Sequence, residues 1–556
     1  MNIDKKQTNM HTFHAHSRDY CDWSIEPPLP QKIDPIQHGL LDGDTFDGTL
    51  KHVDSLWRKK SYICGVLLIQ GNKTFGKTKN GRMYYQCIPN DKALPIFLVP
   101  YDMKVGFNKN PANKYVTFVF DHWKEKHPKG MLKETLGDVD DYETFCQYQL
   151  WCRDLVSSHS KWGRDIKNYF KQKTEEEFFR EIPELEDKTE DPVYSIDPKG
   201  STDLDDAFHI EEIDNVKIKI TIHIANVFLV LQHLDMLQRL SERVATVYLP
   251  HTKYTMLPEI LSENLCSLLE NKTRVSFAME VVYDKHKNEI DLSTLRFYSA
   301  KIKVRKNWDY NDPALQTQKE YVLLRTITYM LQGSKEIPDS HEVVAFWMLF
   351  MNKQCAQTLH QHKTGIFRTV TLDKENTQCP DPAMKEKVFL WNQMNSQYIP
   401  FTDSMNSRHD LLDVEHYTHM TSPIRRLVDL LNQAYFYRDI LKQGSGNALL
   451  QNMDTETTVK NIHLQTKSIK KVQSDCELLY LCKYDQHVMN EQQKGYIFDA
   501  QTDIQSGIYT YSVYILNKIC LFRSHQHHDL YKTYSFRLFL FERENSGHRK
   551  VRLELV

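Results

Sequence analysis

The chain has 556 residues, of which 40% are hydrophobic and 26% charged, and its formal net charge is −2 at pH 7. Eleven scattered cysteines without a C-x-x-C pair argue against a disulfide framework or a zinc site, and no apolar stretch approaches the ~18 residues of a membrane span. We therefore expect a monomeric intracellular protein of roughly three or four domains, cytoplasmic and without membrane association.

The first 150 residues divide into a polar part and a β-rich part. Residues 1–44 are rich in His, Asp and Pro, which predicts a flexible N-terminal tail. Residues 45–150 contain short apolar runs such as "GVLLIQ" and "YVTFVF" between turn signals, which predicts an OB/cold-shock-like barrel. Lysines are in excess here, and Tyr85 is one of several aromatic residues among them. That combination favours single-stranded nucleic acid, and a solvated lysine face is the alternative.

The string "GNKTFGKT" within this region matches the phosphate-binding loop of ATPases and GTPases. Such a loop needs a strand before it and a helix after it. The apolar run before it fits a strand, but Asn80-Gly81 then signals a hairpin turn. We therefore place the string on a strand-turn-strand of the barrel and keep an ATPase only as a minor alternative.

The remaining chain divides into three parts. Residues 151–191 predict a helical linker that ends in an acidic, proline-containing stretch, and residues 192–485 form one large mixed region. In this region "VKIKITIHIANV" alternates as a half-buried strand does, and "KEYVLLRTITYMLQG" has helical character. Residues 490–556 return to strands and predict a second, irregular barrel-like module. The fold class is α+β, with a central mixed α/β domain flanked by small β-barrels.

Four aspartates gather in "YSIDPKGSTDLDDAF" at the start of the central region: Asp197, Asp203, Asp205 and Asp206. Crowded carboxylates repel one another unless a cation lies between them, and an all-oxygen ligand set suits Mg²⁺ or Mn²⁺. Such a site performs metal-assisted phosphodiester hydrolysis. An EF-hand does not fit, because its glycine and glutamate positions are occupied by Thr202 and Phe208. An acidic surface loop with a helix cap is the structural alternative.

A second set of polar residues stands about 220 residues later, in "HYTHMTSPIRRLVDLLNQ". Ser422-Pro423 predicts a helix start, which places Arg425 and Arg426 in the first turn, where anions are favoured. Arg425 would then hold a phosphate in a bidentate manner. The alternative is a salt bridge from the arginine pair to Asp429 along the helix.

Together these segments resemble the ribonuclease II/ribonuclease R family, whose central RNB domain is flanked by oligonucleotide-binding barrels. The family signature I-D-x-x-x-[ST]-x-D-x-D-D-A matches "IDPKGSTDLDDA". Later signatures resemble "HIANV", "VYLPHTKYTMLPEILSENLCSL" and "YTHMTSPIRR". The resemblance covers residues 45–485 and implies an RNB-type catalytic domain with a divergent S1/OB-like module behind it.

The resemblance implies a magnesium-dependent 3′→5′ exoribonuclease that hydrolyses single-stranded RNA to nucleoside 5′-monophosphates. It implies that all four aspartates are metal ligands, that Asp206 is catalytic, and that Arg425 contacts the phosphate near the scissile bond. Tyr248 matches an aromatic residue that stacks on the 3′-terminal nucleotide. On this basis we expect RNA contacts also from Arg426 and from the barrel residues Lys73, Lys77, Lys79 and Tyr85.

The sequence departs from the family pattern at several places. Asn226 stands where the family usually has Asp, and Leu427 where it usually has Tyr. The first N-terminal barrel looks short, we expect no further nuclease domain in front of it, and the final module matches poorly. An inactive RNA-binding protein on an RNB fold is therefore the second hypothesis, with the ATPase third.

Overall fold

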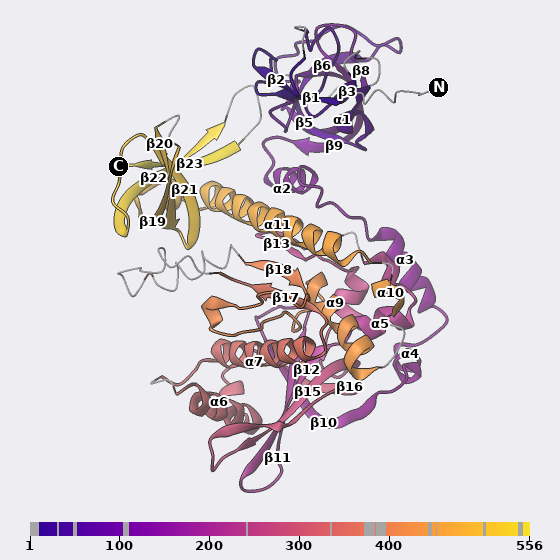
Figure 1. The fold of residues 1–556 in the computed structure, drawn as a ribbon, viewed down its shortest axis with the longest axis vertical. Coiled ribbons are helices and arrows are strands. Elements are labelled where there is room, and N and C mark those ends of the chain that lie inside the picture. Colours follow the sequence, from indigo (N-terminus) through magenta and orange to yellow (C-terminus); the bar gives the residue numbers. More distant parts are fainter. Residues whose placement is uncertain are drawn as a thin grey trace, which may run out of the picture.

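The computed structural model describes residues 10–29, 33–47, 50, 53–103, 111–240, 243–333, 336–371, 384, 396–442, 447–451, 453–503, 507–542 and 549–556. The molecule is elongated (Figure 1). The N-terminal strands lie at one end, the large α/β region lies at the other, and the C-terminal sheet lies beside the long helix between them.

The N-terminal segment is a small sheet, which corrects the expected flexible tail. Its strands, in the order β2-β1-β3-β4, are β1 (Met10–Ala15), β2 (Trp23–Glu26), β3 (Thr45–Asp47) and β4 (Val53–Asp54). Phe13 and Phe46 are fully buried between the strands. The sheet depends on pairing β1 with β3 across some 30 residues, which no local sequence pattern reveals. Residues 1–9 lie outside the described part.

The next module is a closed barrel in the order β5-β6-β7-β9-β8, preceded by α1 (Leu56–Lys59). Its strands are β5 (Ile63–Leu67), β6 (Met83–Pro89), β7 (Phe97–Tyr101), β8 (Lys114–His122) and β9 (Lys129–Asp138). The string "GNKTFGKT" lies in the loop between the antiparallel strands β5 and β6. A tight turn follows it, in which Thr78 N donates to Arg82 O at 2.8 Å. No helix begins at Lys77 in this described loop, so the phosphate-loop context is missing.

Three helices connect this barrel to the central domain: α2 (Tyr142–Trp151), α3 (Ser160–Tyr169) and α4 (Glu175–Glu181). Thr174 and Glu177 form a capping box at the start of α4. Figure 1 shows α2 beside the N-terminal half of the molecule and α3 against the central domain. The linker therefore has contacts of its own with both modules.

The central domain contains a second closed barrel, in the order β10-β11-β12-β15-β16. Its strands are β10 (Glu186–Asp197), β11 (Asp206–Glu212), β12 (Lys217–Ala225), β15 (Thr273–Asp284) and β16 (Glu289–Asp309). Strand β12 differs from the half-buried strand expected, because Thr221 and His223 are buried as well as the isoleucines. The C-terminal part of β12 is covered on both faces, so its polar side chains are buried as well as its apolar ones.

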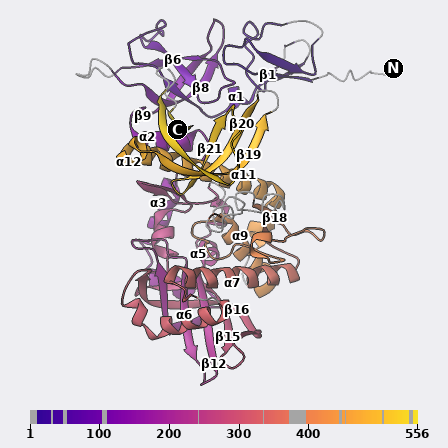
Figure 2. The ribbon, with the colours of Figure 1, turned by 90° about the vertical axis from the view of Figure 1, so that its left-hand side faces the viewer.

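The helices of the central region lie mainly between this barrel and the N-terminal modules, with α6 and α7 beside the barrel (Figures 1 and 2). They are α5 (Val227–His233), α6 (Lys319–Gln332), α7 (Ser340–Gln361), α9 (Leu427–Phe436), α10 (Asn447–Gln451) and α11 (Thr455–Tyr484). Helix α6 confirms the helix expected there and ends at Gly333 in the left-handed conformation. Two further two-stranded sheets pair β13 (Val247–Leu249) with β14 (Thr252–Tyr254), and β17 (Ile366–Thr369) with β18 (Gln397–Pro400).

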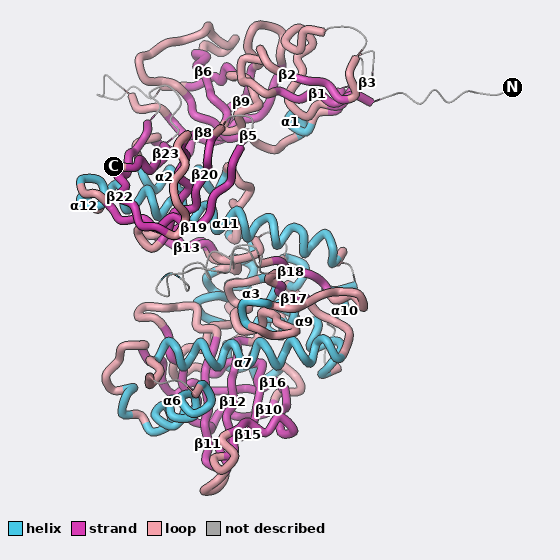
Figure 3. The backbone as a smooth tube through the Cα atoms, turned by 60° about the vertical axis from the view of Figure 1, so that its left-hand side comes forward, coloured by secondary structure: helices cyan, strands magenta, loops and turns pink. Residues whose placement is uncertain are grey.

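The C-terminal module follows α12 (Gln486–Asn490) and is a five-stranded sheet in the order β21-β20-β19-β22-β23 (Figure 3). Its strands are β19 (Gln493–Asp503), β20 (Ile508–Ile515), β21 (Lys518–Ser524), β22 (Lys532–Glu542) and β23 (Arg549–Leu555). Among the described helices, none combines the length and the apolar character needed to cross a membrane.

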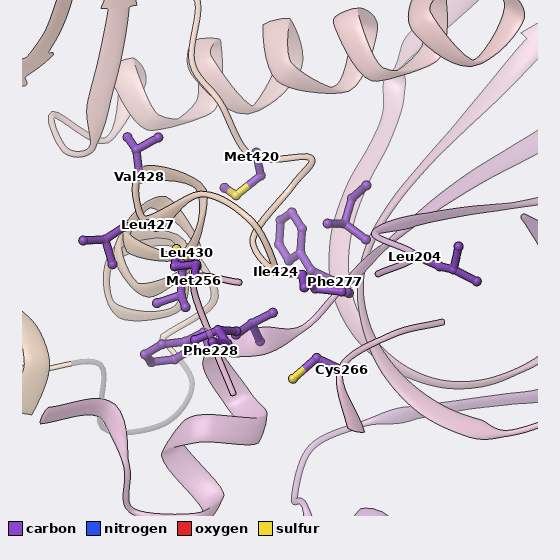
Figure 4. Packing of buried hydrophobic residues seen from close by; sticks show 14 of the residues in the cluster. Leu204, Phe228, Met256, Cys266, Phe277, Met420, Ile424, Leu427, Val428 and Leu430 are labelled. Atoms are coloured by element: carbon purple, nitrogen blue, oxygen red, sulfur yellow. The ribbon is translucent and has the colours of Figure 1, made fainter. Parts of the chain in front are cut away.

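Hydrophobic residues from distant segments meet in the core of the central domain (Figure 4). Leu204 comes from the aspartate loop and Ile424 from the segment that carries the arginine pair, and both are buried in the same cluster. Phe277 of β15 and Phe228 of α5 belong to this cluster too. The core therefore fixes the two polar segments relative to each other.

Candidate active site

The four aspartates lie where two strands of the central barrel end and begin. Asp197 is the last residue of β10 and Asp206 the first of β11, so the loop between them crosses one end of the barrel. Gly200 turns this loop with a φ of +81°, which favours glycine. Ala225 N donates to Asp205 O at 2.7 Å and ties the loop to β12.

Hydrogen bonds with Ser267 also hold the loop in place. Leu204 N donates to Ser267 Oγ at 3.0 Å, and Ser267 Oγ donates to Thr202 O at 2.8 Å. Leu204 itself is 4% exposed. Asp205 and Asp206 are buried beside it, at 2% and 8% exposed, although residues 198–200 at the tip of the loop are exposed. The surface-loop alternative therefore does not fit the part of the loop that carries Asp205 and Asp206.

Asp203 already has two donors. Tyr248 Oη donates to Asp203 Oδ2 at 2.9 Å, and Lys253 Nζ donates to Asp203 Oδ1 at 2.9 Å. Tyr248 and Lys253 face each other across the β13–β14 hairpin. Lys253 also lies 2.8 Å from Glu263 Oε1. The hairpin therefore neutralises and positions this carboxylate.

Asp205 binds the arginine segment through both of its carboxylate oxygens. Ile424 N donates to Asp205 Oδ1 at 3.0 Å, and Arg425 Nε lies 3.2 Å from Asp205 Oδ2. Burial raises the pKa of Asp205 to about 7, although Arg425 opposes this effect. The two segments, 220 residues apart in the sequence, thus meet through an ion pair that the sequence analysis did not predict.

The buried Oδ2 atoms of Asp197, Asp205 and Asp206 all lack a hydrogen-bond partner among the described residues, but only that of Asp205 has an ion pair, with Arg425. Burial raises the pKa of Asp197 from 3.8 to about 6, and a hydrogen bond with Ser195 opposes this. Burial also raises the pKa of Asp206 well above its ordinary value, and the charges of Asp197 and Asp205 add to the effect. The site therefore favours either a bound proton or a bound cation over two free carboxylates.

The donor set fits a hard divalent cation in part. Within the described ranges no three His, Cys, Asp or Glu side chains converge as a ready-made metal cage. Mg²⁺ does not need such a cage, because it is usually held by one or two carboxylates, with water and substrate phosphate completing its shell. Asp197 and Asp206 supply that pair, whereas Asp203 and Asp205 already have other partners.

The arginine pair lies before its helix rather than inside it, which corrects the expected helix start. Helix α9 begins at Leu427 with Arg426 as its N-cap residue, because Ser422 N donates to the buried Asp429 Oδ1 at 2.8 Å and closes a turn there. Arg426 Nη2 donates to Asp429 Oδ1 at 2.9 Å, the salt bridge weighed as its alternative. Arg425 instead points to Asp205, and its side chain is 47% exposed.

The RNA-contacting residues expected in the N-terminal barrel divide into two groups. Lys73, Lys77 and Lys79 are exposed on the β5–β6 loop. Tyr85 is 3% exposed in the barrel core, which corrects its assignment to RNA. Side chains alternate along β6, so the neighbouring Tyr84 is partly exposed, with Lys129 Nζ 5.2 Å from its ring centroid.

Two residues of the site escaped the sequence analysis. Lys253 is one: its ammonium group donates to Asp203, so the site contains a positively charged side chain of its own. Tyr310 is the other: its N–H donates to Asp197 O at 3.1 Å. Burial raises the pKa of the Tyr310 phenol, and the charges of Asp206 and Asp197 raise it further, so the ring lies beside both carboxylates. Only the parallel register of β10 with β16 reveals this proximity.

The departures from the family pattern lie outside the carboxylate cluster. Asn226 is fully buried, caps α5 by accepting from Leu229 N at 3.1 Å, and donates to Tyr437 Oη at 2.6 Å. Leu427 packs in the core and donates its N–H to Val244 O at 2.8 Å. Both residues thus make contacts that stabilise the fold around them.

Comparisons with known proteins agree with this arrangement. A family model described as "RNB domain" matches residues 185–320 and 313–441. The exosome complex exonuclease RRP44 of Mus musculus is 23% identical over 395 residues, which is 57% of this chain and 41% of that protein. The chain thus spans less than half of this relative's length.

The fold comparison extends over almost the whole chain. The apo form of Mycoplasma genitalium RNase R aligns with a TM-score of 0.70 at 16% identity, covering 99% of this chain and 100% of that one. Yeast Ssd1, described as a pseudonuclease, aligns with a TM-score of 0.55 at 14% identity, over 83% of this chain and 69% of that one. The matched RNB domain contains the aspartate loop and the arginine segment, and this chain therefore carries an RNB domain of the kind found in the ribonuclease II/ribonuclease R family.

Proposed function

We propose that this chain is an active, magnesium-dependent 3′→5′ exoribonuclease that releases nucleoside 5′-monophosphates from single-stranded RNA. One observation carries the proposal: Asp197 and Asp206 each keep a buried, unpartnered carboxylate oxygen near Arg425, which is itself paired with Asp205. A protein that had lost catalysis would have no reason to keep two costly carboxylates in its interior.

Asp197 and Asp206 would hold Mg²⁺, or Mn²⁺ in its place. The ion supplies Lewis-acid stabilisation of the negative charge that develops on the phosphate. The charged form of Asp206 costs more free energy than that of Asp197, since burial and two neighbouring carboxylates act on it together. It is therefore the residue whose substitution would reduce catalysis most.

Arg425 would orient the scissile phosphate. Its Nε faces Asp205, and its Nη2 donates to Ser422 Oγ at 3.0 Å, which fixes the guanidinium plane. The remaining N–H donors are available to phosphate oxygens. Water attacks the phosphorus atom, the bond to the 3′-oxygen of the preceding nucleotide breaks, and that oxygen takes up a proton.

Tyr248 would stack on the terminal base. Its ring is 41% exposed while its hydroxyl is held by Asp203, so the ring plane is fixed without being covered. Stacking tolerates any base, which suits a trimming enzyme without sequence preference. Lys73, Lys77 and Lys79 would contact phosphates further along the strand.

The test is digestion of a 5′-labelled single-stranded RNA in Mg²⁺, with EDTA and with Asp206→Asn as two independent ways to remove the site. We expect a ladder that shortens from the 3′ end in Mg²⁺ and no shortening in the other two reactions. RNA that shortens equally in EDTA would exclude the metal role, and RNA that remains intact in Mg²⁺ would exclude the activity.

A catalytically inactive RNA-binding protein is the second candidate. The fold similarity to the pseudonuclease Ssd1 favours it, as does the Lys253 ammonium that lies on Asp203 where a ligand for a metal was expected. This candidate predicts that Asp206→Asn changes neither RNA binding nor any product, so the same digestion separates the two.

A further inference from the structure

The two-stranded sheet of β17 and β18 carries an arginine and a tyrosine on one face. Arg368 and Tyr398 are directly opposite each other in the antiparallel register, so their side chains share a face of the sheet. His419 of the arginine segment contacts both: its Nε2 lies 2.8 Å from Arg368 Nη1, and its Nδ1 lies 2.7 Å from Tyr398 Oη. Arg368 and Tyr398 are half-buried, so solvent still reaches this face.

The two bonds of His419 determine which donors remain at this face. A guanidinium has only donors, so His419 Nε2 is the acceptor and its Nδ1–H donates to Tyr398 Oη. The proton of the Tyr398 hydroxyl therefore remains available for another acceptor. Burial, and then the charges of Arg426 and Arg368, lowers the pKa of His419 well below its ordinary value, so this imidazole is neutral near pH 7.

Arg368 carries a positive charge that no carboxylate of the described residues balances. Its partner His419 is neutral, and its Nε is buried without a hydrogen-bond partner in the part of the chain that the structure describes. Such a donor is costly unless an acceptor binds it. The neighbouring Arg426 differs, because Asp429 Oδ2 lies 2.9 Å from its Nε and matches its charge.

Lys470 brings a second positive charge to the same place. It lies on α11, which packs beside β18 (Figure 1). Burial, and then the charge of Arg368, lowers the pKa of the Lys470 ammonium, and no carboxylate among the described residues opposes this shift. The residue as a whole remains exposed, so an ion can approach it from solvent. Like charges that act on each other in this way repel unless an anion binds between them.

The available donors suit a phosphate group. Arg368 offers a planar set of N–H donors, Tyr398 a hydroxyl and Lys470 an ammonium, which together match the several oxygens of a phosphate. These donors lie beside Arg426, whose charge acts on Tyr398. Arg425, which orients the scissile phosphate in the function proposed above, is the preceding residue of the chain.

We propose that Arg368, Tyr398 and Lys470 form a second phosphate site beside the arginine segment. The site binds a phosphate that does not react, which belongs either to the RNA strand or to a released nucleoside 5′-monophosphate. The choice between these two sources rests on the proposed function, whereas the affinity of the site for phosphate does not.

The test measures equilibrium binding in EDTA, with adenosine 5′-monophosphate and a single-stranded RNA of about 12 nucleotides as probes. Lys470→Ala removes the exposed cation of the site. Lys471→Ala is the matched control, because it removes the same charge from the next residue of α11, where Nζ is paired with Asp475 Oδ1 at 2.7 Å. Arg368→Gln and the double variant Arg368→Gln/Lys470→Ala complete the set. Thermal midpoints close to that of the unmodified chain would show that the variants fold.

We expect Lys470→Ala to weaken binding of at least one probe by about fivefold or more, and Lys471→Ala to weaken it by less than about twofold. If the probe is RNA, the slope of log K against log salt should decrease by about 0.7 in Lys470→Ala, the value for one lost phosphate contact on a single strand. The double variant should weaken binding by less than the product of the two single effects, because both side chains bind the same phosphate.

An effect on RNA alone would assign the phosphate to the strand, and an equal effect on the monophosphate would assign it to the free nucleotide. The proposal is overturned if Lys470→Ala and Lys471→Ala bind both probes with the same affinity, or if the effects of Lys470→Ala and Arg368→Gln simply multiply. If Arg368→Gln fails to fold, the comparison of the two lysine variants still decides. An inactive RNA-binding protein would give the same readouts, so failure of the proposed function is distinguishable.

Discussion

Neutralising Asp197 should stabilise the metal-free protein. The pKa of this carboxyl is raised from 3.8 to about 6 by burial. One pKa unit corresponds to about 1.4 kcal/mol, so the charged form costs the folded state up to ~3 kcal/mol at neutral pH. Asp197→Asn removes the charge and should raise the thermal midpoint in EDTA at pH 7.5 by several degrees.

The sign of the pH dependence follows from the raised pKa. The penalty is absent below pH ~4, where the carboxyl is protonated in both the folded and the unfolded states. It grows between about pH 4 and 6, where the carboxyl is ionised in the unfolded chain but protonated in the folded one, so the advantage of Asp197→Asn should vanish at low pH and be complete at pH 7.5. Differential scanning fluorimetry over this range measures it. Added Mg²⁺ should raise the midpoint of the unmodified chain and leave that of the variant unchanged.

Asp203→Asn is the matched control with the opposite sign. Its carboxylate accepts from Tyr248 and Lys253, so the substitution removes a charge that already has partners. It should lower the free energy of unfolding by about 1–3 kcal/mol at pH 7.5. A metal-free Asp197→Asn protein that is less stable than the unmodified chain at pH 7.5 would refute the reasoning.

Further substitutions at five residues test individual contacts. Arg425→Lys should lower kcat about 100-fold in single-turnover digestion, since lysine cannot present two parallel donors, and an unchanged kcat would remove the phosphate role. Tyr248→Ala should raise the KM for single-stranded RNA about tenfold while Tyr248→Phe leaves it unchanged, and equal effects would exclude stacking. Asn226→Ala should lower the free energy of unfolding, measured in urea, by about 2 kcal/mol. Asn226→Asp should retain activity, and a large loss of activity in that variant would place Asn226 in the site. Tyr84→Ala should weaken RNA binding without loss of stability. Tyr85→Ala should instead destabilise the barrel by about 3 kcal/mol. The reverse pattern would contradict the orientation of β6.

The sequence was sufficient to predict which segments form the site. Four closely spaced aspartates and a distant arginine segment carry their chemistry in their residue types, and the structure joins them through Asp205 and Arg425. It could not divide the aspartates into paired and unpaired members. That division depends on Lys253 and Ile424, which approach from other parts of the fold.

The errors share a physical origin. Tyr85 and Tyr84 are adjacent in the sequence, and only the position of β6 in the barrel decides which one faces the core. The arginine pair looked like a first helical turn, but the buried Asp429 draws Ser422 into a preceding turn. The N-terminal sheet was missed because its strands are short and pair across long loops. In each case tertiary contacts overrule a correct local pattern.

Anomalous diffraction from crystals soaked in Mn²⁺ would test most directly whether Asp197 and Asp206 hold a divalent ion. We predict one peak within ligand distance of an oxygen of each of these two aspartates, and its loss in Asp206→Asn. A peak bound instead by Asp203 and Asp205, or no peak at Mn²⁺ concentrations that support RNA cleavage, would contradict this assignment.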